Sequence, residues 1–530
     1  MGYAHEYATA VMRRGRVPME PADFVPDWSD RPRKGKFFPG APSFPLPDGG
    51  CADDATLSRG LFGANGTKAF TLASLGAMLR DSYGLTGRRL AVQANSDLGS
   101  LPFHTHANWS RGTASGGGLY PIGIHWVSGA SGPLTPGVHH YDTRHHRLTR
   151  LLSGDVTGEV RACLGELAEA ADTDQFLVLE VTFWQNSFKY NSFGYHAITM
   201  DVGALLQTWR MWARAHDIHL GTAALWFDER RLDRLLGLDP EQAGVFAVVP
   251  LRWAGTAPQT SAPALPHARV RRTHAERSRR VLSFPTLLRI HEATVHEAAA
   301  RPAPGLLEKA RAAPEGPGDR VALPAPAALD SPVRRALRER RSSFGRFTSH
   351  APLHADQLSA VLAAADAAGN LDTDAETPGG APLARLFVFV NHVNGVRRGL
   401  YTYDRGNHAL VTVEPGDFGL FLQQNYFLAN YNLEQAAAVL VPVARTHAVL
   451  DAVGDRGYRL VNAVVGAIAQ AVYTAAAAAK TACGVALGFD CVSYAERFQV
   501  AEHDEIPLLT MMIGNEQPRP ADYRYDIVAP

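Results

Sequence analysis

The sequence predicts an α+β fold that occurs twice within one chain. Three observations lead to this prediction. The chain has 530 residues, which is more than one hydrophobic core usually organises. Helical and strand-like patterns alternate along it, and its two halves share a series of short motifs in the same order. We expect the two copies to pack on each other as a pseudo-dimer within the chain.

The shared motifs lie 262 or 263 residues apart. GVHHYDTRHHRL from Gly137 is matched by GLYTYDRGNHAL from Gly399, and GYHAITMDVGALLQ from Gly194 is matched by GYRLVNAVVGAIAQ from Gly457. Two shorter matches follow the same spacing: WFD and GFD, ending at Asp228 and Asp490, and the glycine pairs Gly116–Gly117 and Gly379–Gly380. A constant order and spacing indicate two diverged copies of one domain.

The copies are expected to span residues 1–254 and 330–530, joined by a linker at 255–329. Proline- and alanine-rich stretches in this linker surround a basic segment, HARVRRTHAERSRRVLSF, which is predicted to be helical. A solvated helix face is the simpler interpretation of its charges, and contact with an acidic partner is the alternative.

The elements follow in the same order in both copies. In the first copy we expect a helix at 72–82, strands at 122–127 and 176–183, a helix at 198–215 and a strand at 245–251. In the second copy we expect a helix at 355–368, strands at 386–390 and 438–443, a helix at 460–479 and a strand at 508–513. The helix at 460–479 is apolar almost all round, which predicts that it is buried between the two halves.

The composition favours a soluble, cytoplasmic protein. The formal net charge is zero, with 46% hydrophobic and 20% charged residues, so no basic surface indicates nucleic acid. No apolar run approaches the roughly 18 residues that a membrane span needs, and the start of the chain lacks the apolar core of a signal peptide. Four scattered cysteines indicate neither a disulfide framework nor a zinc site.

Histidine-rich stretches raise the question of a metal site. One contains His104 and His106, and the other is HHYDTRHH. Only Tyr141, Asp142 and His146 of the second stretch recur in the second copy, in a pattern typical of strand–turn–strand. Because no carboxylate–histidine spacing accompanies them, we expect no metal.

Two groups of residues have the chemistry of a binding or catalytic site. Arg340, Arg341 and Ser342 follow a helical stretch and are suited to clamp a phosphate, although an exposed helix end is the simpler interpretation of these residues alone. Lys189 and Tyr190 follow an apolar strand, and an ammonium beside a phenol stabilises the phenolate, which favours proton transfer. An ordinary loop dipeptide is the alternative for this pair.

In combination, these motifs resemble the FMN-dependent nitroreductase superfamily, in its SagB-type azoline dehydrogenase branch. RGTASGGGLYP at 111–121 is similar to the R-x-x-P-S-G-G-x-x-Y-P stretch of that family, with Ala114 in place of the proline. The residues from Arg340 match its R-R-S motif, Lys189 and Tyr190 match its lysine–tyrosine pair, and GFD from Gly488 closes the second copy.

The resemblance implies a duplicated nitroreductase-like fold with FMN between the copies. The implied cofactor-binding residues are Arg340, Arg341 and Ser342 at the phosphate, and Ser115, Gly116, Gly117, Arg111 and Gly488 elsewhere in the site. Lys189 and Tyr190 are the implied catalytic residues.

The implied reaction oxidises thiazolines or oxazolines in ribosomally made peptides to thiazoles or oxazoles. Dioxygen is the expected final oxidant, and the enzyme that makes azolines, a cyclodehydratase, is the expected partner in a complex. Two alternatives remain: another flavin oxidoreductase, such as an NAD(P)H nitroreductase or a peptide desaturase, and a scaffold that has lost its flavin.

The site residues are divided unequally between the copies. Ala452 and Val453 stand opposite the lysine–tyrosine pair, and Pro378 stands opposite Ser115. Leu57, Ser58 and Arg59 are expected opposite the paired arginines, so a second, mirror-related site is expected to be empty. In addition, Phe193 replaces an arginine of the family that the second copy keeps as Arg456.

Overall fold

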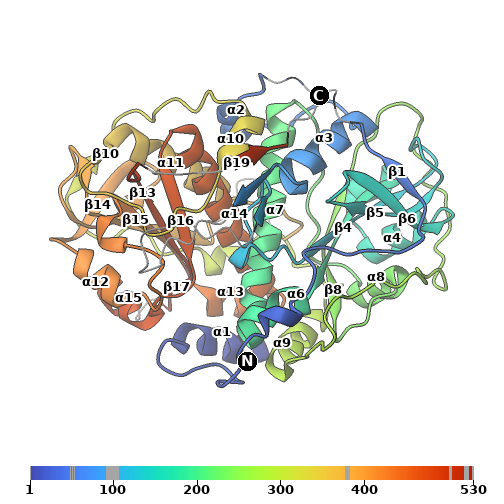
Figure 1. The fold of residues 1–530 in the computed structure, drawn as a ribbon, viewed down its shortest axis with the longest axis horizontal. Coiled ribbons are helices and arrows are strands. Elements are labelled where there is room, and N and C mark those ends of the chain that lie inside the picture. The colour runs from blue at the N-terminus through green and yellow to red at the C-terminus, as the bar shows by residue number, and fades with distance from the viewer. Residues whose placement is uncertain are drawn as a thin grey trace.

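Two lobes, each built on an antiparallel sheet, flank a central pair of long helices (Figure 1). The computed structural model describes residues 2–47, 49, 52, 54–90, 107–375, 382–500, 504–518 and 524–527. The central helices are α7 (Gly194–Ala215) and α14 (Gly457–Ala478), one from each half of the sequence. Helix α1 (Tyr3–Arg13) lies at one end of this pair, and the C-terminal end of the chain lies at the other.

The sheet of the first lobe has the order β1-β6-β5-β4-β7-β8, and all neighbouring strands run antiparallel. Its strands are β1 (Ser43–Pro45), β4 (Ile122–Ser128), β5 (Gly137–Asp142), β6 (Arg147–Ser153), β7 (Gln175–Thr182) and β8 (Ala243–Pro250). The helices of this half, besides α1 and α7, are α2 (Leu57–Phe62), α3 (Leu72–Tyr83), α4 (Thr157–Leu164), α5 (Ala168–Ala171), α6 (Trp184–Tyr190) and α8 (Glu229–Leu236). Short 3-10 turns are η1 (Trp28–Asp30), η2 (Gly116–Gly118) and η3 (Asn191–Phe193).

The sheet of the second lobe has the order β16-β18-β15-β11-β13-β14-β9, with β17 beside β15. Its strands are β9 (Arg320–Ala322), β11 (Ala384–Val390), β13 (Gly399–Asp404), β14 (Ala409–Pro415), β15 (Ala438–Ala444), β16 (Ala482–Ala486), β17 (Ile506–Pro507) and β18 (Thr510–Gly514). The helices of this half, besides α14, are α10 (Val333–Glu339), α11 (Ala355–Ala368), α12 (Gly419–Gln424), α13 (Thr446–Val453) and α15 (Cys491–Phe498), with the 3-10 turn η5 (Leu433–Gln435).

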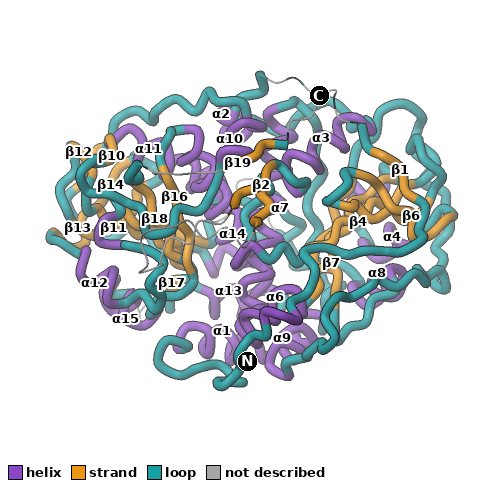
Figure 2. Tube along the Cα trace, in the orientation of Figure 1, coloured by secondary structure: helices purple, strands orange, loops and turns teal. Residues whose placement is uncertain are grey.

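Two smaller sheets complete the strands. The short strands β10 (Leu353–His354) and β12 (Val393–Asn394) pair in parallel. The C-terminal strand β19 (Arg524–Asp526) pairs with β2 (Gly87–Leu90), which pairs on its other side with β3 (Ala107–Ser110). The end of the chain therefore returns to the first half (Figure 2).

The two large sheets share one topology. The order β6-β5-β4-β7-β8 in the first lobe corresponds to β14-β13-β11-β15-β18 in the second. Both hairpins carry a β-bulge at the same place, after Val138 in β5 and after Leu400 in β13. In both, a tyrosine hydroxyl lies against the Nδ1 atom of a histidine five residues on, at 3.0 Å for Tyr141 and 2.7 Å for Tyr403. The repeated motifs thus correspond to repeated structure.

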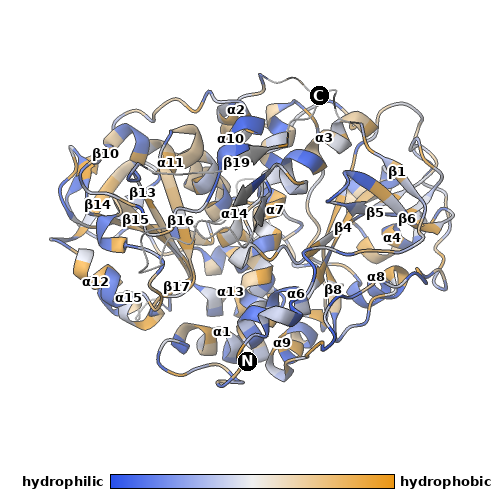
Figure 3. Ribbon diagram, viewed as in Figure 1, coloured by the Kyte–Doolittle hydropathy of each residue, from blue (hydrophilic) through white to orange (hydrophobic). Residues whose placement is uncertain are grey.

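Helices α7 and α14 cross closely because each has a glycine at the crossing. A Cβ atom at Gly203 would overlap the carbonyl oxygen of Ala463, and one at Gly466 would overlap that of Met200. The two glycines are partners in the sequence repeat. Helix α14 is long and apolar enough to cross a membrane by length and composition, but 94% of its most apolar window is buried. It is therefore the buried core helix that its sequence predicts. Over the peripheral loops, hydrophilic and apolar segments alternate (Figure 3).

The linker between the halves is folded onto both of them. It contains α9 (Pro285–Val295) and the 3-10 turn η4 (Leu306–Ala310), and its strand β9 pairs with β14. The prediction of a helix in the basic segment is wrong, because no helix occurs between residues 267 and 284. Backbone N–H groups there bind other partners instead: those of Arg279 and Arg280 donate to the carboxylate of Asp30.

The other predicted elements are present, most of them with shifted ends, and the helix at 355–368 has the predicted ends. The helix predicted at 198–215 begins four residues earlier, at Gly194, and the one predicted at 460–479 begins at Gly457. Lys189 and Tyr190 lie in the last turn of helix α6, not in a loop. The local pattern missed α6 because it is short and buried.

One predicted correspondence is wrong. Leu57, Ser58 and Arg59 lie inside α2, whereas Arg340 follows the end of α10. Helix α2 packs on α7 and α11, and α10 packs on α14 and α3, so these two helices hold corresponding positions. The equivalents of the arginines therefore begin at Gly63, where again no arginine pair occurs. The alignment failed because the loop after α10 is longer than the loop after α2.

Candidate active site

The segment 111–121 before strand β4, called the glycine loop below, is hydrogen-bonded to the buried carboxylate of Asp201 on α7. The hydroxyl of Ser115 donates to one oxygen of Asp201 at 2.6 Å, and the N–H of Gly116 donates to the other at 2.8 Å. The N–H of Tyr120 in turn donates to the Ser115 hydroxyl at 2.8 Å. These hydrogen bonds fix the conformation of the loop, and with it the orientation of the backbone at Gly116 and Gly117.

The glycine loop lies against the lysine–tyrosine pair. Gly117 has φ of +62°, and a Cβ atom there would lie 2.6 Å from the hydroxyl of Tyr190 and 3.1 Å from Nζ of Lys189. The ammonium of Lys189 lies 4.8 Å from the centre of the Tyr190 ring. Only glycine fits at this position, both for its backbone conformation and for its close approach. Two motifs some 70 residues apart are thus brought into contact.

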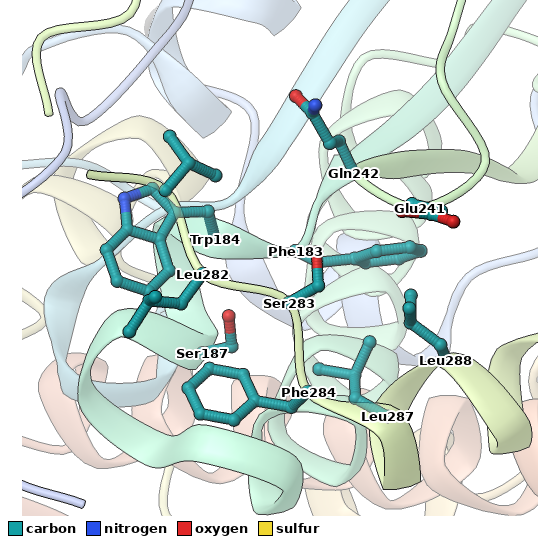
Figure 4. A pocket seen from close by; sticks show the side chains of 11 residues that line it. Phe183, Trp184, Ser187, Glu241, Gln242, Leu282, Ser283, Phe284, Leu287 and Leu288 are labelled. Atoms are coloured by element: carbon teal, nitrogen blue, oxygen red, sulfur yellow. The ribbon is translucent and has the colours of Figure 1, made fainter. Parts of the chain in front are cut away.

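Linker residues pack against Trp184 and Ser187 of α6, the helix that contains Lys189 and Tyr190. The indole N–H of Trp184 donates to the hydroxyl of Ser278 at 3.0 Å. Phe284 is buried and packs edge-on to Phe24, with ring centres 5.1 Å apart. Figure 4 shows Leu282 and Phe284 of the linker around the side chains of Phe183, Trp184 and Ser187. The linker and the N-terminal segment therefore hold α6 in place.

The arginine pair of the second half meets the same loop from the other side. Arg340 is buried and donates from Nε to the carbonyl of Gly112 at 2.9 Å and from Nη2 to that of Arg111 at 3.0 Å. Its neighbour Arg341 pairs with Glu516 at 2.5 Å. These contacts place residues from 340 onward directly beside the glycine loop.

The next residues continue this contact with α14. The hydroxyls of Ser342 and Tyr473 lie 2.8 Å apart, and the Arg340 guanidinium lies 5.1 Å from the centre of the Tyr473 ring. One turn earlier on the same helix, Gln470 accepts from the N–H of Ala114 at 2.9 Å. Helix α14 thus joins the arginine segment to the glycine loop of the other half.

Gly488 contacts the segment of the second lobe that contains Tyr426 and Phe427. The N–H of Phe427 donates to its carbonyl at 2.8 Å, and a Cβ at Gly488 would lie 3.8 Å from the ring of Tyr426. Burial raises the pKa of Tyr426, and the neighbouring phenol of Tyr190 raises it further. Tyr426 is thus near Gly488 and within electrostatic reach of Tyr190.

Sequence reasoning missed Asp201, which the structure places at the centre of the loop's contacts. Burial raises the pKa of Asp201 to about 7, although the hydrogen bonds from Ser115 and Gly116 favour the ionised carboxylate. The available signal was an aspartate inside the apolar run ITMDVGALL, since a charged residue on a buried helix face needs a polar partner.

Buried polar atoms around the loop are suited to a flavin. Among the described residues, both amide atoms of Asn186 and the hydroxyl of Ser343 are buried without a hydrogen-bond partner. A Cβ at Gly118, which also has φ of +62°, would meet no atom within 4 Å. Unpartnered buried groups beside an open glycine backbone fit a polar ring system with donors and acceptors at its edge, such as isoalloxazine.

The described histidines are not grouped around a possible metal site. His139 and His140 are buried in β5, and burial lowers the pKa of His139 to about 4. His146 binds Tyr141 in the hairpin turn, and His104 and His106 lie outside the described residues. Within the part of the chain that the structure describes, no group of three or more His, Cys, Asp or Glu side chains has a metal-binding arrangement.

Arg456, the counterpart of Phe193 in the second copy, is in contact with the linker. Arg456 donates to Glu229 at 2.6 Å and to the carbonyl of Thr294 at 2.9 Å, and Arg301 pairs with Asp374 at 3.0 Å. The arginine kept in the second copy is thus buried in an ion pair between the halves. Pro378, Gly379 and Gly380 lie outside the described residues.

The sequence model described as the Nitroreductase family matches residues 337–515. The second lobe is a nitroreductase-family domain. That family consists of flavin oxidoreductases that generally bind FMN. The domain is similar to the "Putative nitroreductase" of Methanocaldococcus jannaschii, at 29% identity over 194 residues, which cover 34% of this chain and 87% of that protein.

The fold of the whole chain is similar to that of a solved protein. The crystal structure of a putative nitroreductase from Anabaena variabilis superimposes with a TM-score of 0.74 at 21% identity, covering 98% of this chain and all of the other. The chain therefore has a nitroreductase-like α+β fold throughout. A weaker likeness, with a TM-score of 0.28 and 16% identity, covers 48% of this chain and 94% of a chain in the E. coli microcin synthetase McbBCD complex with truncated pro-MccB17 bound.

Proposed function

We propose that this protein is an FMN-dependent dehydrogenase that oxidises thiazolines or oxazolines in ribosomally made peptides to thiazoles or oxazoles. The proposal treats residues 1–254 and 330–530 as two copies of one nitroreductase-like domain, which form a pseudo-dimer joined by the linker at 255–329. It is supported by the shared topology of the two lobes and by the nitroreductase-family domain in the second.

The observation that carries the proposal is the contact between Gly117 and the pair Lys189–Tyr190. A glycine backbone that fits a flavin edge has beside it an ammonium and a phenol, which are suited to move a proton. This pairing therefore favours dehydrogenation of a substrate that must also lose a proton.

In this proposal both halves hold the cofactor. Arg341 and Ser342 are assigned to the phosphate together with Arg340, which has two nitrogen atoms already bonded to backbone carbonyls. The assigned contacts to the ring system are Ser115, Gly116, Gly117, Arg111 and Gly488. When bound there, FMN supplies a hydride acceptor. The buried linker residues around Arg456 support a single cofactor per chain.

The side chains of this protein supply the proton chemistry. An azoline becomes an azole by losing one hydride and one proton, and the product ring is aromatic. Tyr190 is assigned to take the proton, and the positive charge of Lys189 stabilises the phenolate that accepts it. Tyr426 of the second lobe is close enough to Tyr190 for the charge of that phenol to raise its own pKa. Dioxygen is the proposed final oxidant, and a cyclodehydratase complex is the proposed partner.

Replacing the proton-transfer pair tests the proposal. We expect Tyr190→Phe and Lys189→Ala to lower azoline oxidation by about a hundredfold or more, because general acid–base groups contribute rates of this order. The measurement is azole formation from a thiazoline peptide by mass spectrometry, at equal flavin content by absorbance. Lys309→Ala, an exposed lysine outside the site, is the control and is expected to match the wild type.

Three results would contradict the proposal. Azole formation at the wild-type rate by both variants would exclude Lys189 and Tyr190 from catalysis. Rapid bleaching of the flavin by NADPH with a nitroaromatic acceptor, without azole formation, would establish the nitroreductase alternative. A colourless protein that does not bind added FMN would leave only the scaffold alternative.

A further inference from the structure

A small cavity lies where helix α1 meets the central helices and the second lobe, and none of its lining residues belongs to the glycine loop or to the lysine–tyrosine pair. Three polar residues that line it have a buried atom without a hydrogen-bond partner in the described part of the chain: Nη2 of Arg14, Oγ1 of Thr446 and Oδ1 of Asn462. Thr446 and Asn462 are each only 1% exposed. Because buried polar atoms are ordinarily hydrogen-bonded, these three indicate that the cavity has an occupant.

Arg14, which follows the end of α1, brings a positive charge to this cavity. Its Nη1 atom donates to the carbonyl of Val11 at 2.8 Å and to the sulfur of Cys491 at 3.5 Å. Its guanidinium lies 4.5 Å from the ring centre of Phe193 and 6.0 Å from that of Phe489. Aromatic faces and neutral acceptors stabilise part of this charge, but they do not neutralise it.

The groups around the Arg14 guanidinium are uncharged or already paired. Burial raises the pKa of the Cys491 thiol by more than the charge of Arg14 lowers it, so the sulfur keeps its proton. Burial and the charge of Arg14 lower the pKa of His196 to about 3, so the imidazole is neutral near pH 7. Asp490 pairs with Arg16 instead, at 3.3 Å. Since a charge removed from water ordinarily has an opposite charge beside it, the missing counter-ion of Arg14 points to an anion in the cavity.

Two helices begin at the same cavity. Thr446 is the first residue of α13, and Cys491 is the first residue of α15. The N–H groups in the first turn of a helix have no partner within the helix, and the helix dipole is positive at that end, so both helix ends favour an anion. The amide oxygen of Asn462 is an acceptor, and a water molecule bound beside the anion would donate to it.

We propose that this cavity binds a small monovalent anion such as chloride, held by Arg14, by the hydroxyl of Thr446 and by the first turns of α13 and α15. The anion would hold Arg14 against Phe193, whose ring meets that of Tyr190 edge-on with the centres 6.2 Å apart. The end of α1 would thereby support the segment that follows the catalytic pair. The site is separate from the proposed phosphate site, and the inference does not depend on the proposed reaction.

Thermal unfolding of the full chain with excess FMN tests the site, with sodium chloride replacing sodium gluconate at constant ionic strength. We expect the melting temperature to rise by about 1–3 °C and then to level off, because an anion that binds only the folded state stabilises it until the site is full. Arg14→Gln is expected to abolish the rise. Thr446→Val is expected to need about fivefold more chloride, because it removes one hydrogen bond. Arg13→Gln, which removes a neighbouring exposed charge, is the control and is expected to respond as the wild type does.

A crystal of the wild-type chain soaked in sodium bromide gives a measurement that does not depend on the folding of any variant. We expect an anomalous peak within hydrogen-bond distance of Nη2 of Arg14 and Oγ1 of Thr446. No peak in this cavity would mean that it holds water only, and a peak without a chloride-dependent rise in melting temperature would mean binding at crystal concentration only; either result would overturn the proposal. A rise that Arg14→Gln retains would also contradict it. A rise that occurs only without FMN would place the anion at the segment from Arg340, and the proposal would again be wrong.

Discussion

Gly117 and Gly118 have the same backbone conformation and different surroundings. Both have φ of +62°, but only a Cβ at Gly117 would meet Tyr190 and Lys189. Replacing either by alanine is expected to cost about 1–2 kcal/mol of stability, because alanine is strained in the left-handed region. Gly117→Ala is expected in addition to displace the pair and to abolish most of the activity at equal flavin content, whereas Gly118→Ala leaves the pair in place and is expected to act only through flavin binding. Thermal unfolding and turnover, measured on both variants, separate strain from displacement; equal activity in the two would contradict the contact.

Asp201 links the stability of the glycine loop to pH. Its pKa is about 7 in the folded protein and 3.8 as the ordinary value, so the folded state holds the proton more tightly. The stability that this proton contributes is complete below about pH 4 and is lost as the pH rises through about 7. We expect Asp201→Asn, which stays neutral, to gain stability relative to the wild type over this range. Melting temperatures of both proteins from pH 5 to 9 test this; a difference that does not change with pH would contradict it.

At the scale of elements, the crossing of α7 and α14 depends on Gly203 and Gly466. A methyl group at Gly203 would overlap the carbonyl of Ala463, so the helices would have to separate. We expect Gly203→Ala to destabilise the protein by about 1–3 kcal/mol, as overpacking of a core does, despite the better helix propensity of alanine. Gly369→Ala at the end of α11, where the nearest atom is 3.3 Å away, is the control. Chemical unfolding of both variants measures the difference, and equal midpoints would contradict the close crossing.

Helices were predicted accurately where an apolar pattern continues over many residues. The prediction failed where contacts with distant residues determine the local conformation. The helix at 355–368 was predicted with its observed ends, since its apolar pattern continues over its whole length. The basic segment from His267 was predicted as a helix and is extended, because Asp30 and Phe37 bind its backbone N–H groups. Such partners lie more than 200 residues away in the sequence, and no local pattern records them.

At the scale of the whole molecule, a buried ion network joins the halves. Glu229 of α8 accepts from Arg456, which precedes α14, at 2.6 Å and from Arg459 of α14 at 2.8 Å. Burial alone would raise the pKa of Glu229, but the charges of Arg459 and Arg456 outweigh it and lower the pKa. The linker adds His291, whose ring nitrogen lies 3.2 Å from Arg459. The halves are therefore held together by charge as well as by the apolar faces of the central helices.

The sequence by itself determined the fold class, the repeat and the residue types of the candidate site. These follow from apolar periodicity and from matched motifs, both of which can be recognised in the sequence alone. Only the tertiary structure decided that Gly117 meets Lys189 and Tyr190, that Asp201 supports the loop, and that Arg340 bonds the loop of the other half. These contacts join residues of different elements across the packed central helices, and side-chain burial and hydrogen-bond partners are set by that packing.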